Sequence, residues 1–164
     1  MSGTEEYYPL PQPDEVSIRE REDAMGAYMM MFAAMAAGLP LPIINFIAAV
    51  IYYYINKSKS KFVHFHSLHS LMAQFPTSIL NVGLVFWTLR IWLSGWEFST
   101  YCKAYIGMVI IANLLYFIFS IVAAVRARKG RFYYFLFFGR FAYEVVYRVK
   151  DESPTSSVNL PPGS

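Results

Sequence analysis

Long apolar segments separated by short charged ones dominate the pattern of this chain. Residues 24–56 contain no Asp, Glu, Lys or Arg, and residues 62–125 carry fixed charge only at Arg90, Glu97 and Lys103. A helix needs about 20 predominantly apolar residues to cross the hydrocarbon core of a bilayer. The pattern therefore predicts an all-α integral membrane protein.

The first apolar run is interrupted by Gly38-Leu39-Pro40-Leu41-Pro42. As one straight helix, residues 24–55 would be about 48 Å long, well beyond the ~30 Å hydrocarbon core. Two prolines also remove backbone donors and clash with the preceding turn. We therefore expect a hairpin at Gly38–Pro42 between two short helices, at about 17–38 and 43–56. A re-entrant pair that does not fully cross and a single kinked helix are the alternatives.

Two longer helices are predicted at about 63–93 and 100–127, and they complete a four-helix transmembrane domain over residues 17–130. Because the link between them is short, they should be antiparallel neighbours. All three tryptophans of the chain lie around this link, at Trp87, Trp92 and Trp96. Tryptophan is enriched where a membrane meets water, so we expect these three to be interfacial anchors.

Basic residues gather before the third predicted helix and after the fourth. These residues are Lys57, Lys59 and Lys61, then Arg126, Arg128, Lys129 and Arg131. With a hairpin at Gly38–Pro42, both clusters and both termini fall on one side, which the positive-inside rule makes cytoplasmic. The sequence thus predicts a multi-pass protein of the bacterial cytoplasmic (inner) membrane. The net charge of +3 then reflects topology and anionic lipid headgroups, and we expect no binding to nucleic acid.

The flanking segments differ in pattern from the predicted helices. Residues 1–16 are acidic and proline-containing and predict a flexible cytoplasmic arm, and residues 151–164 predict a disordered tail. Residues 131–150 predict an amphipathic helix, because apolar side chains recur at helical spacing opposite Arg140, Glu144 and Arg148. This helix is expected to lie in the cytoplasmic interface of the membrane or to pack on the end of the bundle.

Polar residues form a stripe along one face of the third predicted helix. They are His66, Ser70, Gln74, Ser78 and Asn81. A polar stripe avoids lipid, so we expect it to face other helices through hydrogen bonds, with Asn45 and Asn113 as partners. A water-lined path for a substrate or ion and a ligand site are the alternatives.

The three histidines, His64, His66 and His69, do not assemble a convincing metal site. His66 and His69 are three residues apart and could face one ion, but no carboxylate is near in sequence and Cys102 is predicted at the opposite face. The sequence also offers no Ser-His-Asp set, no paired buried carboxylates and no phosphate-binding loop. We therefore predict no metal, no cofactor and no enzymatic activity.

Three segments resemble a family of small four-helix membrane proteins. They are FVHFHSLHSLMAQ, the preceding GLPLPIINFIAAVIYYYINKSKS and the later AAVRARKGRFYYF. The family includes the chloroplast inner-envelope import component, magnetosome-membrane proteins and many bacterial proteins. Its pattern at the start of helix 3 is F-V-x-x-H-x-x-Q/E-x-L-x-x-Q, matched by Phe62, Val63, His66, Leu71 and Gln74, whereas His69 replaces the usual amide or acid. The resemblance spans about residues 23–141 and implies a four-helix membrane fold.

These features together predict an interaction or assembly subunit of a larger membrane complex, including one that moves proteins. Its expected partners are the lipid bilayer and other membrane subunits or further copies of itself. The alternative is a small channel or transporter that uses the polar face of residues 63–93.

Overall fold

The computed structural model describes residues 7–33, 42–95 and 97–149, and the described chain is all-α. Its elements are α1 (Ile18–Met29), the 3-10 turn η1 (Met30–Phe32), α3 (Pro42–Asn56), α4 (Lys61–Ser94), α5 (Thr100–Arg128) and α6 (Leu136–Tyr147). Among these residues, the only extended pairing is an isolated antiparallel bridge between Tyr7 and Arg148.

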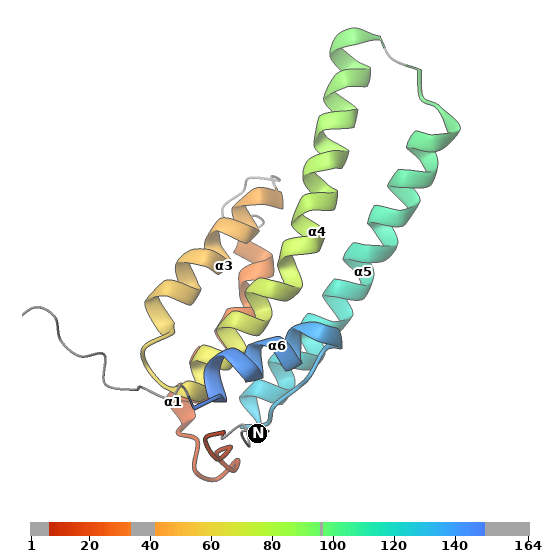
Figure 1. The fold of residues 1–164 in the computed structure, drawn as a ribbon. Helices are drawn as coiled ribbons and strands as arrows, with labels where there is room; N and C mark the ends of the chain where they lie inside the picture. The colour runs from red at the N-terminus through yellow and green to blue at the C-terminus, as the bar shows by residue number, and fades with distance from the viewer. Residues whose placement is uncertain (1–6, 34–41, 96, 150–164) are drawn as a thin grey trace, which may run out of the picture.

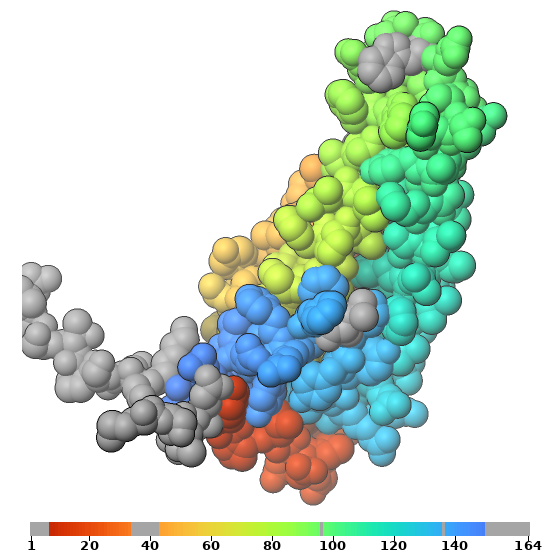
Figure 2. All heavy atoms as spheres, turned by 45° about the vertical axis from the view of Figure 1, so that its right-hand side comes forward, coloured from red at the N-terminus to blue at the C-terminus, as the bar shows by residue number. Residues whose placement is uncertain are grey.

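The helices α4 and α5 form a long hairpin that sets the shape of the molecule (Figure 1). The elements α1, α3 and α6 gather around one end of this hairpin, called here the compact end, where α1 packs on both α4 and α5 while α3 and α6 pack on α4. The other, distal end projects beyond them as a helix pair, and the space-filling view shows the same extension (Figure 2). Both long helices therefore have a protein-covered part and a part outside it.

Two helices, α4 and α5, are long and apolar enough to cross a membrane. Relative to the predicted 63–93 and 100–127, α4 begins two residues earlier and ends one later, and α5 ends one later. The helix α3 begins at Pro42, one residue before the predicted start. The helix α1 ends at Met29 and continues as η1, and most of the predicted Gly38–Pro42 hairpin falls outside the described residues.

Local side-chain chemistry explains how α4 begins and ends. The Ser60 hydroxyl accepts a hydrogen bond from the Val63 amide at 3.2 Å, which satisfies one free donor of the first turn. Pro76 lies inside the helix without ending it, and the Thr77 hydroxyl donates to the Gln74 carbonyl at 2.8 Å beside it. At the C-terminus, Gly95 adopts a left-handed conformation (φ 60°) that a glycine tolerates without strain.

Residues 7–16 differ from the flexible arm expected of residues 1–16. The Tyr7 ring stacks on Tyr143 with centroids 5.2 Å apart, and the Tyr8 amide donates to the Tyr147 carbonyl at 2.8 Å. Val16 is only 3% exposed. The physical reason is that these side chains find aromatic and aliphatic partners at the compact end, which composition alone does not indicate. Residues 1–6 and the predicted tail at 151–164 lie outside the described residues.

The helix α6 uses one face to pack on the bundle. Ala142 and Tyr147 are fully buried against Phe65 and Leu68 of α4, in a shared apolar cluster. Phe137, on another side of α6, is 84% exposed. Of the two expectations for residues 131–150, packing on the end of the bundle therefore describes the buried face, while the exposed aromatic side remains suited to a membrane interface.

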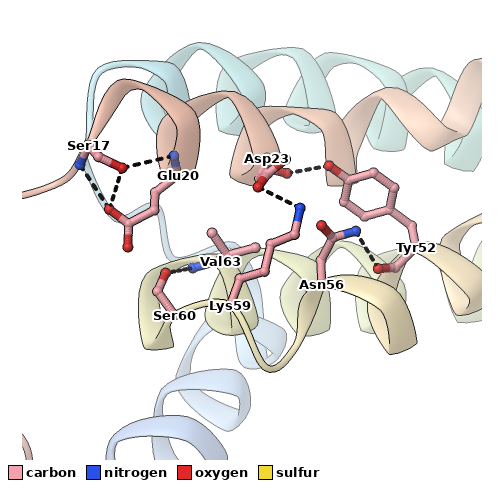
Figure 3. A network of polar contacts seen from close by, with 8 residues as sticks. All are labelled: Ser17, Glu20, Asp23, Tyr52, Asn56, Lys59, Ser60 and Val63. Atoms are coloured by element: carbon pink, nitrogen blue, oxygen red, sulfur yellow. Dashed lines mark hydrogen bonds and ion pairs between the residues drawn. The ribbon is translucent and has the colours of Figure 1, made fainter.

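Polar contacts hold α1 to α3 and to the segment that joins α3 and α4 (Figure 3). The Lys59 ammonium lies 2.7 Å from the Asp23 carboxylate, and the Tyr52 hydroxyl donates to the Asp23 carbonyl at 2.7 Å. At the start of α1, Ser17 and Glu20 form a capping box, in which each side chain accepts a hydrogen bond from the backbone N–H of the other residue. The hydrogen bond from the Ser17 hydroxyl lowers the pKa of Glu20, because it favours the charged carboxylate.

Candidate functional site

The most enclosed polar group of the described chain is a cluster of Tyr28, His66 and His69. Tyr28 lies on α1, and the two histidines lie on α4, three residues and thus about one turn apart. The Tyr28 Oη atom is 2.9 Å from Nδ1 of His66 and 2.9 Å from Nδ1 of His69. The three side chains are 2%, 0% and 1% exposed, so water cannot replace these contacts.

This geometry requires the two imidazoles to differ when both are neutral. A tyrosine hydroxyl has one proton and can donate to only one Nδ1 atom. The other histidine must then carry its proton on Nδ1 and donate it to the Tyr28 oxygen. One ring is therefore the Nε2–H tautomer and the other the Nδ1–H tautomer.

Aromatic rings enclose His66. Its ring centroid is 4.5 Å from that of Phe62, and it stacks on Phe132 at 5.7 Å with an interplanar angle of 22°. The His66 Nε2 atom has no hydrogen-bond partner among the described residues. The aromatic rings therefore enclose the His66 imidazole in largely apolar surroundings.

A cavity of about 10 Å³ lies beside His69 and is lined also by Tyr116 and Ser120. This volume is near the lower limit for one water molecule, and the lining offers several polar groups to hold it. Apart from such a water, the site has no room for a substrate. The cluster is therefore suited to fixing α1 against α4.

The remaining members of the predicted stripe on α4 also face protein. The Ser70 hydroxyl donates to the Ala27 carbonyl of α1 at 2.8 Å. Gln74 is 3% exposed and Ser78 is 9% exposed. The Gln74 Oε1 atom has no partner among the described residues. The structure thus places His66, Ser70, Gln74 and Ser78 on a buried face of α4.

Asn81, the last residue of the predicted stripe, meets Asn113 of α5. Each side-chain amide donates to the carbonyl oxygen of the other, at 2.9 and 3.1 Å. Asn45, the other predicted partner, lies half-buried on α3, a helix that packs along α4. The stripe and its expected partners are therefore distributed over three helices.

The predicted anchors and basic clusters lie at opposite ends of the hairpin (Figure 1). Trp87 contacts Tyr105 with ring centroids 5.5 Å apart, and Trp92 is 79% exposed, whereas Trp96 falls outside the described residues. The segments that carry the two basic clusters, residues 57–61 and 126–131, both lie at the compact end.

Metal-binding groups do not gather in the part of the chain that the structure describes. Residues 7–33, 42–95 and 97–149 contain no group of three or more His, Cys, Asp or Glu side chains placed to hold one ion. His64 stands apart from the other two histidines, since its Nε2 atom lies 3.2 Å from the Tyr53 hydroxyl.

A protein-family model matches residues 22–142, which is most of the chain, and it describes the magnetosome magnetite crystal formation protein family, MamF/MmsF. The chain belongs to this family. No curated protein matches the sequence. No solved structure matches it either.

The MamF/MmsF match includes the whole buried cluster and the Asn81–Asn113 pair, because it runs from within α1 to within α6. It supports the magnetosome part of the resemblance seen in the sequence and not the chloroplast import part. With two helices suited to crossing a bilayer, family membership also supports a membrane location.

Tyr28 is the residue of this site that the sequence analysis did not identify. It lies 38 residues from His66, and nothing in the α1 pattern specifies that the two meet. A usable signal exists, since a tyrosine in a long apolar run needs a buried partner for its hydroxyl. The histidines of α4 were the available partners, one as acceptor and the other as donor.

Proposed function

We propose that this chain is a non-enzymatic, multi-pass membrane subunit that assembles with other subunits or with its own copies during magnetite crystal formation in the magnetosome membrane. Membership of the MamF/MmsF family supports the setting. The assembly role rests on one structural observation, which is the uncovered distal half of the α4–α5 hairpin.

That distal half presents large apolar side chains with little intramolecular cover. In the most apolar 18-residue window of α4, only 6% of the residues are buried. Exposed apolar residues of this region include Val82, Phe86, Leu89, Ile110, Ile111 and Leu114. Lipid can cover such a surface, and so can the equivalent surface of another subunit through close van der Waals packing.

Gly107 of α5 supports the second kind of cover. A Cβ atom added there meets no atom within 4 Å in the described chain. The glycine is therefore not required by packing within one subunit. A small residue on a membrane helix allows the backbone of another helix to approach closely. Gly107 thus gives the proposed contact a specific position to test.

The channel alternative has less support from the geometry. The stripe on α4 is buried within a single chain, and Ser70 and Asn81 form hydrogen bonds to α1 and α5. The cavity beside His69, at about 10 Å³, is far smaller than a substrate path requires. These contacts favour the interpretation that the stripe holds helices together over the interpretation that it lines a channel.

The proposed topology places both termini and both basic clusters in the cytoplasm. The described ends of the chain lie near the compact end, together with Lys59 and Arg128 (Figure 1). The positive-inside rule then places the distal link on the opposite side of the membrane. Accessibility labelling of a cysteine introduced at Ser99 and of one at Ser58 should report opposite sides.

The test of assembly is the size of the gently solubilised protein. We expect the parent protein to be recovered as oligomers or with membrane partners, measured by native mass spectrometry and by cross-linking in the membrane. Gly107→Leu should reduce this association by about tenfold, since a bulky side chain prevents close helix approach. Ile111→Leu is the matched control, because it conserves volume at a site that is 61% exposed. A parent protein that runs as a lone monomer under all mild conditions would contradict the proposal.

A further inference from the structure

A groove of about 420 Å³ lies between α1 and α5 at the compact end. Its walls are apolar, from Met25 and Met29 on α1 and from Ile121, Ala124 and Val125 on α5. The two remaining lining residues are Arg128 and Lys129, at the C-terminal end of α5. The groove is thus apolar along its length and basic at one end.

The position of the basic end matches the depth of a lipid headgroup. The helix α5 is a candidate membrane span, and Arg128 is its last residue. The apolar part of the groove, from Ile121 to Val125, precedes this end by one to two helical turns. A lipid in the surrounding leaflet would therefore meet the apolar walls with its chain and the cations with its phosphate.

The two cations, Arg128 and Lys129, are both exposed and so available to a ligand. Arg128 has a side chain 60% exposed, and its Nη1 atom lies 3.9 Å from the Met25 sulfur, so the guanidinium lies over the groove. Its only acidic neighbour in the described chain is Glu22, at 4.0 Å and with a 55% exposed side chain. Such a long and exposed ion pair contributes little free energy, so a phosphate can compete with Glu22 for the guanidinium.

We infer that this groove binds one anionic phospholipid, with an acyl chain against Met25, Met29 and Val125 and the phosphate between Arg128 and Lys129. A zwitterionic headgroup carries its own cation, which offsets the charge of its phosphate. An anionic headgroup has a net negative charge, and this charge can pair with the two adjacent bases. This inference does not depend on the proposed assembly role, since a monomer can bind the lipid equally well.

The experiment measures lipid retained by the full-length protein in native mass spectrometry, after reconstitution with phosphatidylglycerol or phosphatidylcholine. We expect one phosphatidylglycerol to be retained and phosphatidylcholine to be lost. A juxtamembrane base is worth roughly a fivefold change in affinity, so Arg128→Gln with Lys129→Gln should weaken retention by about 30-fold. Val125→Trp should also weaken it, because the indole fills the groove.

Further single variants separate loss of the site from loss of the fold. Arg126→Gln removes one positive charge on the same turn of α5 and is matched to Arg128→Gln alone, which should weaken retention by about fivefold. Arg126 does not line the groove, so retention by the Arg126→Gln variant should stay within about twofold. Glu22→Gln removes the competing carboxylate and should strengthen retention. Equal retention of both lipids, equal losses for Arg126→Gln and the double variant, or displacement of the lipid by millimolar inorganic phosphate alone would each overturn the inference.

Discussion

Asn81 and Asn113 join α4 to α5 by two reciprocal amide hydrogen bonds, at 2.9 and 3.1 Å. The second N–H of each amide donates to a carbonyl four residues earlier on its own helix, Thr77 at 2.7 Å and Val109 at 2.8 Å. All four amide N–H groups are therefore used. This pair is the clearest polar link along the hairpin.

The first prediction concerns the coupling between these two asparagines. Asn81→Leu or Asn113→Leu alone should destabilise the protein, since each leaves the other amide with an unmet partner in an apolar setting. The double variant should cost less than the sum of the two. The coupling free energy should be about 0.6 kcal/mol and no more than about 1.7 kcal/mol, the range known for polar contacts in membrane bundles. A double-mutant cycle by denaturant titration in mixed micelles measures it, and strictly additive effects would contradict the pairing.

The second prediction concerns Tyr28. Tyr28→Phe keeps the ring but removes the only hydroxyl shared by His66 and His69. One buried Nδ1–H group then loses its acceptor, which should cost about 1–3 kcal/mol in the free energy of unfolding. Tyr101→Phe is the control, because Tyr101 is 79% exposed and its change should stay within about 0.5 kcal/mol. Equal stability of both variants would show that the cluster does not form.

The third prediction concerns pH and the first turn of α1. Because the pKa of Glu20 is lowered in the folded protein, its contribution is fully present above the pKa of the unfolded chain. That contribution is lost as the pH falls through the lower, folded pKa. Since Glu20 is largely solvated, the loss should be below about 1 kcal/mol.

Hydrogen exchange of the first-turn amides of α1, corrected for intrinsic rates, measures this effect. Protection should fall between neutral pH and about pH 3, with most of the loss below the ordinary carboxyl pKa of about 4.3. Glu20→Gln should remove the pH dependence, and Ser17→Ala should reduce it. The same pH dependence in the Glu20→Gln variant would assign the effect to another group.

The helix ends were the most predictable part of this fold. Each long helix follows a serine whose hydroxyl caps it, Ser60 before α4 and Ser99 before α5, and each is a continuous apolar run. These signals are local, so the sequence is sufficient to read them. The position of Pro76 inside α4 was also consistent with a continuous helix, because Thr77 donates to a nearby carbonyl.

The contacts between helices were much less predictable. The faces of α4 follow from its 3.6-residue period, so the sequence identified a polar stripe, but not that Tyr28 would reach two of the α4 histidines. The amphipathic pattern of α6 has the same appearance whether its apolar face meets lipid or protein. Its packing on α4 through Ala142 and Tyr147 depends on complementary shape, which no local pattern encodes.

The last prediction concerns the contact between Gly83 of α4 and Tyr105 of α5. A Cβ atom added at Gly83 would overlap the Tyr105 hydroxyl, which donates to the Leu80 carbonyl at 2.9 Å. Gly83→Ala should therefore displace the Tyr105 side chain from its hydrogen bond with Leu80 or move the two helices apart, at a cost of about 1–3 kcal/mol. In a Tyr105→Phe background the overlapping oxygen is absent, so the same substitution should cost at least about 0.5 kcal/mol less. Gly107→Ala is the matched control in a detergent that keeps the protein monomeric, since within one chain its added methyl group meets open space and should be neutral or stabilising by up to about 1 kcal/mol. Thermal unfolding in detergent measures all four variants, and an equal cost of Gly83→Ala in both backgrounds would show that α4 and α5 do not approach each other here.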